Sequence, residues 1–181
     1  VDTRMDQPFY QYARDVHSQN GEDGVISELL RRLGVTEGWV VESGAWDGVH
    51  LSNTFALVER GFRALYIEGD AAKYEDLLAT ARRFPDRIVP VHSMLERNDD
   101  TLGKLMRQHV PVDPAVLSID IDSWDYDVWK NLDPACRPMI VVIEIDSAVY
   151  PYDWKIFGRN SVSGTSFLPM LLLGAEKGYR L

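Results

Sequence analysis

Five short, almost wholly apolar runs are spaced along this chain, and each ends in a polar or acidic residue. The runs are rich in β-branched residues and lack strict alternation, which is typical of strands buried on both faces of a sheet. Segments with helical periodicity separate them. The runs cover residues 39–41, 64–67, 88–91, 116–119 and 139–143, and the residues that end them are Glu42, Glu68, His92, Asp120 and Glu144.

Strands that alternate with helices favour an α/β fold, here a Rossmann-like parallel sheet with helices on both faces. We expect the strand order 3-2-1-4-5 with right-handed crossovers. Pro90 cannot donate a hydrogen bond, so the third run is predicted to be an edge strand or to carry a bulge. Because no linker or internal repeat interrupts the pattern, residues 1–181 are predicted to form a single domain.

The end of the chain suggests that this domain is truncated at its C-terminus. The helical pattern over residues 167–177 stops at Gly178, and Tyr179-Arg180-Leu181 is expected to begin a further strand. The last strands of the sheet would then be missing. An open sheet edge favours pairing with another chain, so a homo-oligomer is a further expectation.

The charge balance disfavours two classes of partner. The chain carries 19 Lys and Arg against 28 Asp and Glu, a formal net charge of −9. Nucleic acid and anionic membrane surfaces both attract basic proteins, so neither is expected as a partner. No apolar run approaches the ~18 residues that a membrane span needs. A single cysteine, Cys136, and an N-terminus without a signal-like apolar stretch fit a cytoplasmic protein.

A glycine-containing turn, Glu42-Ser43-Gly44-Ala45-Trp46-Asp47-Gly48, follows the first run. Gly44 allows a sharp turn, Gly48 allows close approach of a ligand, and the next helix directs its N–H groups there. The spacing differs from the dinucleotide motif G-x-G-x-x-G. Glu68 lies 20 residues beyond Gly48 (68 − 48), where an acid can accept both hydroxyls of a ribose. The alternative is a solvated acid at a strand end.

The chain carries four short motifs that occur together, in the same order, in one family of enzymes. They are residues 18–23 (Ser-Gln-Asn-Gly-Glu-Asp), 42–48, 66–70 and 118–122. The chain resembles the FkbM-like class I methyltransferases, which use S-adenosylmethionine. The chain departs from that pattern at Asp122-Ser123, where the family carries an acid-glycine pair, and in its missing last strands. The resemblance implies that the cofactor is bound by Gln19, Glu42, Gly44, Gly48, Glu68, Gly69, Asp70, Ser93, Met94 and Asp120.

Carboxylates gather after the fourth and fifth runs, at Asp120, Asp122, Glu144 and Asp146. Packed carboxylates repel each other, so some must be protonated, paired or metal-bound. Oxygen ligands suit Mg²⁺ or Ca²⁺ better than zinc, which makes Asp120, Asp122 and Asp146 candidate metal ligands. A solvated acidic rim, or a set of helix caps, is the alternative. Asp122, Glu144 and His17 are the candidate catalytic bases.

The function implied by the resemblance is methyl transfer to a hydroxyl of a sugar or other small metabolite, with alignment as the enzyme's main contribution. Two other hypotheses stay open. One is a Rossmann-like binding module without catalysis. The other is a Mg²⁺-dependent enzyme acting on a nucleotide-linked substrate. The irregular stretch 147–165 is expected to contact the substrate, with Trp154 as the best candidate.

Overall fold

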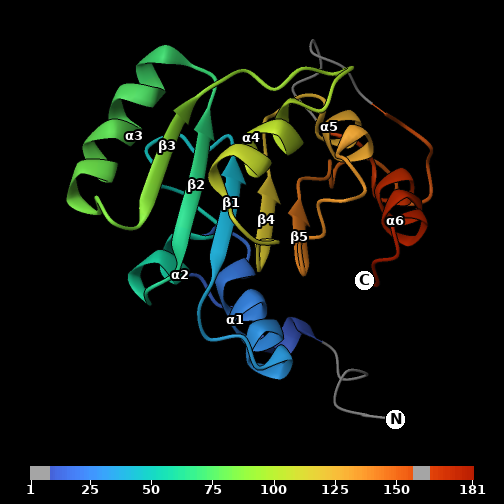
Figure 1. The fold of residues 1–181 in the computed structure, drawn as a ribbon. Helices are drawn as coiled ribbons and strands as arrows, with labels where there is room; N and C mark the ends of the chain where they lie inside the picture. Colours follow the sequence, from blue (N-terminus) through green and yellow to red (C-terminus); the bar gives the residue numbers. More distant parts are fainter. Residues whose placement is uncertain (1–8, 157–163) are drawn as a thin grey trace.

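A single five-stranded sheet forms the centre of the molecule (Figure 1). A computed structural model of the chain describes residues 9–156 and 164–181. All neighbouring strands are parallel and their order is β3-β2-β1-β4-β5, which confirms the predicted α/β fold and strand order. The strands are β1 Trp39–Ser43, β2 Arg63–Glu68, β3 Ile88–His92, β4 Val116–Ile119 and β5 Ile140–Ile143.

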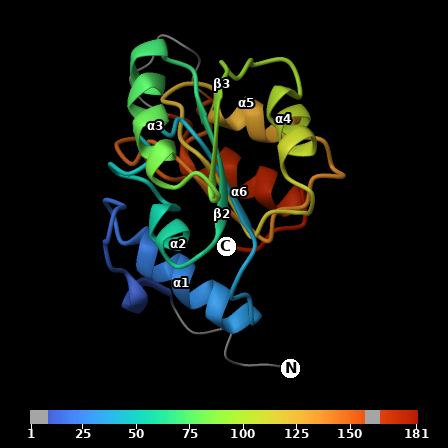
Figure 2. The ribbon, with the colours of Figure 1, turned by 60° about the vertical axis from the view of Figure 1, so that its left-hand side comes forward.

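Helices cover both faces of this sheet (Figure 2). A short 3-10 helix at Phe9–Tyr12 precedes them. The α-helices are α1 Glu22–Leu33, α2 Phe55–Glu59, α3 Ala71–Arg83, α4 Thr101–His109, α5 Asp125–Asn131 and α6 Phe167–Glu176. None of the helices in the described ranges is long and apolar enough to cross a membrane.

Two hydrophobic cores lie on opposite sides of the sheet because successive strand residues point to opposite faces. Val40 packs with α1, α2 and α3 through residues such as Leu30, Val58 and Leu77. Its neighbour Val41 belongs to the other core, to which α4, α5 and α6 contribute. Every residue of β1 is buried, as the absence of alternation in the sequence predicts.

The two edges of the sheet and the end of the chain bear on further predictions from the sequence. β3 is an edge strand, which confirms the prediction drawn from Pro90. β5 is the other edge of the described sheet. The strand expected at Tyr179-Arg180-Leu181 is wrong, since these residues form no strand. The Tyr179 ring instead packs 5.9 Å from that of Trp129, and its hydroxyl donates to the Pro138 carbonyl at 2.8 Å. C-terminal truncation and oligomerisation stay predictions.

Candidate functional site

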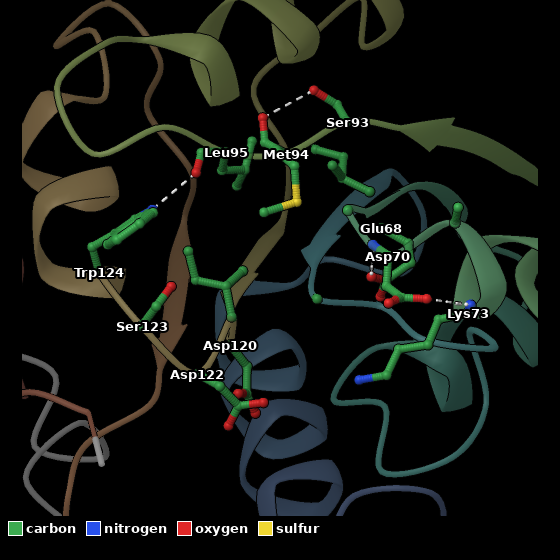
Figure 3. Close-up of a pocket in the computed structure, with 15 residues that line it drawn as sticks. Glu68, Asp70, Lys73, Ser93, Met94, Leu95, Asp120, Asp122, Ser123 and Trp124 are labelled. Atoms are coloured by element: carbon green, nitrogen blue, oxygen red, sulfur yellow. Dashed lines mark hydrogen bonds between the residues drawn. The ribbon is translucent and has the colours of Figure 1, made fainter. Parts of the chain in front are cut away.

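A cavity of about 480 Å³ opens at the carboxyl ends of β1, β2 and β4 (Figure 3). Ligands of open α/β sheets bind at this edge, beside the point between β1 and β4 where the strand order reverses. The lining comes from the segments that follow β1, β2, β3 and β4. Its residues are Gly44, Ile67, Glu68, Gly69, Asp70, Ala71, Lys73, Ser93, Met94, Leu95, Asp120, Ile121, Asp122, Ser123 and Trp124.

Gly44 forms the floor of the cavity between β1 and β4. Its φ is +76°, a conformation that side chains disfavour, and a Cβ built on it would lie 1.7 Å from the Asp120 carbonyl oxygen. Its N–H donates to the Ile67 carbonyl at 3.0 Å, which ties the turn to β2. The close approach of two backbones therefore requires glycine here.

Glu68 is held in place by backbone N–H groups of the segments that follow β1 and β2. One carboxylate oxygen accepts from the Trp46 N–H at 2.8 Å, and the other accepts from the Asp70 N–H at 2.7 Å. Although only 6% exposed, the side chain lines the cavity. A carboxylate offers about four lone-pair sites. Each oxygen can thus still accept from a ligand hydroxyl, in a fixed orientation.

Asp70 and the residues after β3 form a second wall. Asp70 caps α3 by accepting from the Ala72 and Lys73 N–H groups, and these hydrogen bonds lower its pKa. Ser93 and Met94, from the segment after β3, also line the cavity, and Met94 is 48% exposed. Gly69 lies against the Met94 sulfur, where a side chain would collide. Gly69, Ser93 and Met94 in this wall offer a thioether and small residues, a surface that suits a flat, weakly polar group.

The segment after β4 has a strained and tightly bonded backbone. Asp122 has a φ of +55°, which is uncommon for a residue with a side chain. Asp125 is fully buried and accepts from the Ile121 and Ser123 N–H groups, at 2.8 and 3.2 Å. The Trp124 indole donates to the Leu95 carbonyl at 2.9 Å. These bonds fix the direction in which Asp120 and Asp122 face the cavity, and strain of this kind is common at functional sites.

Three carboxylates converge beside this segment. One oxygen each of Asp120, Asp122 and Glu144 lies within 4.8 Å of the other two. Burial, followed by the charges of Asp125 and Asp122, raises the pKa of Asp120 to about 6. Burial, followed by the charge of Asp120, raises the pKa of Glu144 to about 8. The Glu144 Oε2 atom is buried and has no hydrogen-bond partner within the described residues. The group can hold a proton or a cation.

Glu42 and Gly48, which the resemblance assigns to the cofactor, lie outside the cavity lining. Glu42 is buried, and its carboxylate accepts from the Ser52 hydroxyl at 2.7 Å, the Thr54 hydroxyl and the Asn53 N–H. It thereby orders the segment that enters α2. A Cβ on Gly48 would meet Leu77 and Tyr66, so this glycine serves the packing of the core. Their roles in cofactor binding stay predictions without geometric support.

The segment before α1 also lies apart from the cavity lining. The His17 ring contacts Phe55 edge-on at 4.8 Å and pairs with the Glu59 carboxylate at 3.0 Å, beside α2. Gln19 is exposed. The role of His17 as a base and that of Gln19 in cofactor binding therefore remain predictions that this arrangement does not favour. Residues 18–23 have a structural role instead, because the buried carboxylate of Asp23 accepts hydrogen bonds from three backbone N–H groups.

The third acid beside Asp120 and Asp122 is Glu144, whereas Asp146 was the predicted metal ligand. Among the described residues, Asp146 does not belong to the compact group, and its carboxylate accepts from the Ala148 N–H. Trp154 is 59% exposed and is absent from the cavity lining. Residues 157–163 of the stretch expected to contact the substrate lie outside the described residues.

Sequence reasoning missed Lys73 and Leu95 as cavity residues. Lys73 is in the first turn of α3, and Leu95 follows Met94 after β3. A signal for Lys73 was present, since the first turn of a helix that follows a strand ending in an acid lies at the same edge of the sheet.

Comparison with known proteins gives a structural likeness and no match in sequence. No family model matches the chain, and no curated protein matches it either. A methyltransferase of Geobacter sulfurreducens, solved with S-adenosylhomocysteine, is 16% identical, with a TM-score of 0.50. The alignment covers 96% of this chain and 70% of that one.

Two further solved structures are similar over different lengths. A methyltransferase of Aquifex aeolicus is 14% identical, with a TM-score of 0.47, and the alignment covers 98% of this chain and 86% of that one. An O-methyltransferase of Bacillus cereus is 15% identical, with a TM-score of 0.42, and the alignment covers 66% of this chain and 56% of that one. The strand order and the Geobacter structure together define the fold as the Rossmann-like fold of S-adenosylmethionine-dependent methyltransferases.

Proposed function

We propose that this protein is an S-adenosylmethionine-dependent methyltransferase that acts on a hydroxyl of a sugar or another small metabolite. The observation that carries the proposal is Glu68, a preoriented carboxylate at the end of β2, facing a cavity whose floor at Gly44 has no room for a side chain. Within this fold, the order of the sequence motifs favours the FkbM-like branch.

The side chains that line the cavity fit this cofactor. Glu68 would accept the two ribose hydroxyls, and Ser93 and Met94 would flank the adenine. Asp120 would lie beside the amine of the methionine part, because its carboxylate faces the cavity next to Gly44. Two backbone N–H groups hold the Glu68 carboxylate in a fixed orientation, which lowers the entropy cost of binding. When bound, S-adenosylmethionine supplies an electrophilic methyl group.

Glu144 and Asp122 are the groups that would accept a proton from the acceptor hydroxyl. Glu144 has a pKa of about 8, so a minor fraction is ionised at neutral pH, and this fraction is a stronger base than an ordinary carboxylate. Its buried, unpartnered Oε2 atom is ready to receive a hydrogen bond. Asp122, whose backbone strain sets its direction, lies beside it.

Titration calorimetry with S-adenosylhomocysteine tests the proposal. Binding of one molecule per chain is the expected result, with ATP and NAD as competitors that fail to displace it. If the chain binds neither S-adenosylmethionine nor S-adenosylhomocysteine, the proposal is wrong. Binding without methyl transfer to any of a panel of sugars and small hydroxyl compounds would favour a binding module.

A second candidate function is a Mg²⁺-dependent enzyme that acts on a nucleotide-linked substrate. The convergence of Asp120, Asp122 and Glu144 favours it, because hard divalent cations prefer several carboxylate oxygens. Thermal unfolding with and without Mg²⁺ or Ca²⁺ separates the two candidates. A rise in the melting temperature that is lost in Asp122→Asn, and retained in a variant at exposed Asp153, would support the metal.

A further inference from the structure

Lys73 is the only basic residue in the cavity lining of the described chain. The other charged residues of the lining are the carboxylates of Glu68, Asp70, Asp120 and Asp122. A ligand that brings an anionic group into this cavity meets repulsion from four acids and attraction from one ammonium. Lys73 is therefore the residue that decides whether such a group is accepted.

The Lys73 side chain points into the cavity from α3 (Figure 3). It starts in the first turn of α3 and is directed toward the side where Asp120 and Asp122 lie (Figure 3). No carboxylate of the described residues lies close enough to form an ion pair with its ammonium. The hydrogen-bonding capacity of this group is thus available to a ligand, although the residue itself is half-buried.

The Trp46 ring holds the ammonium in place, with the Nζ atom 4.8 Å from the ring centroid, a cation–π contact. The φ of Trp46 is +46°, and its N–H donates to Glu68. The strained backbone at Trp46 thus orients both the carboxylate of Glu68 and the ring beneath Lys73. Trp46 therefore contacts both the Glu68 carboxylate and the Lys73 ammonium.

We propose that Lys73, supported by Trp46, binds the amino-acid carboxylate of S-adenosylmethionine and makes the site selective for ligands that carry this carboxylate. The inference rests on the proposed function. Glu68 takes the ribose and Asp120 takes the amine, which leaves the carboxylate as the anionic group of the ligand without a partner. Lys73 is the basic residue of the described cavity lining, so it is the group that can pair with this carboxylate.

Calorimetry with two ligands that differ only in the carboxylate tests this assignment. The ligands are S-adenosylhomocysteine and its decarboxylated analogue, S-adenosyl-3-thiopropylamine. Lys73→Met should weaken binding of the first by roughly ten- to a hundred-fold, the scale of a charge-assisted hydrogen bond, and leave binding of the second unchanged. Lys73→Arg should retain most of the affinity for S-adenosylhomocysteine, because the positive charge is kept.

Two further variants sharpen the test. Lys130→Met is the matched control, because Lys130 is exposed, has a cation–π contact with Tyr126 and is absent from the cavity lining. It changes the net charge equally and should leave both affinities unchanged. Trp46→Leu removes the aromatic support and should reduce the preference for S-adenosylhomocysteine by about two- to five-fold.

The outcomes separate this inference from the proposed function. An equal loss of affinity for both ligands in Lys73→Met, or no loss for either, overturns the role of Lys73 while the proposed function stands. If the unaltered chain binds neither ligand, the proposed function fails and this inference fails with it. A loss confined to the ligand with the carboxylate supports the assignment.

Discussion

Gly44 and the carbonyl of Asp120 are so close that a methyl group does not fit between them, since a Cβ on Gly44 would lie 1.7 Å from the carbonyl oxygen. The two residues follow neighbouring parallel strands, β1 and β4. This approach closes the floor of the cavity and sets the position from which the Asp120 carboxylate faces it. The glycine turn is thus a packing requirement as well as a feature of the ligand site.

Gly44→Ala should destabilise the protein by about 3 kcal/mol or more, since overpacking and an unfavourable φ act together. Denaturant unfolding measures the change. Gly34→Ala is the matched control, because Gly34 has a similar φ of +71° and nothing within 4 Å of its would-be Cβ. It should cost only about 1 kcal/mol. Equal losses in the two variants would show that the contact with Asp120 does not matter.

Stability should fall as the pH rises through the range in which Glu144 titrates. Its pKa is about 8 in the folded protein against an ordinary value of 4.5, so the folded state binds the proton more tightly. The resulting stabilisation is complete below about pH 4.5 and is lost as the pH approaches 8. Asp120, with a pKa of about 6, acts in the same direction.

Glu144→Gln should therefore flatten this decline and raise the free energy of unfolding near pH 8.5 by about 1 kcal/mol relative to the parent. Urea unfolding between pH 5 and 9 measures it. Glu75→Gln, at an exposed position of α3, is the control and should leave the slope unchanged. A parallel decline in Glu144→Gln and the parent would contradict the account of the carboxylate group.

Asp23→Ala should destabilise the protein by about 3 kcal/mol, because buried N–H groups would lose a charged acceptor. The carboxylate is 4% exposed and accepts from the backbone of Val16, His17 and Ser18. Thermal and urea unfolding would measure the loss. Glu22→Ala removes a carboxylate that accepts one exposed N–H, from Asn20, and should cost less than about 1 kcal/mol. Similar losses of stability in Asp23→Ala and Glu22→Ala would argue against a structural role of the Asp23 carboxylate.

The sheet and the ends of its strands were predictable because both depend on local pattern. A β-branched run without alternation indicates burial on both faces, and the acids that end these runs come to one edge of a parallel sheet by geometry alone. That geometry placed Glu68 and Asp120 at the cavity. It also brought Glu144 beside Asp120 and Asp122.

The direction of individual side chains was not predictable, since it depends on partners far away in sequence. Glu42 ends its strand as Glu68 does, yet it points toward the hydroxyls of Ser52 and Thr54. Lys73 lines the cavity from the first turn of α3, a helix that packs on β2 and β3. Tyr179 finds a carbonyl and an aromatic neighbour beside α5, and these contacts outweigh its tendency to form a strand.

The affinity of S-adenosylhomocysteine for Glu68→Ala is the most direct test of the central claim that the Glu68 carboxylate binds the ribose of the cofactor. Calorimetry of the parent, of Glu68→Ala and of the surface variant Glu75→Ala gives the comparison. We expect Glu68→Ala to weaken binding by roughly 1.5–3 kcal/mol and Glu75→Ala to leave it unchanged. An affinity of Glu68→Ala within a few tenths of a kcal/mol of the parent, the scale of a surface substitution, would contradict it.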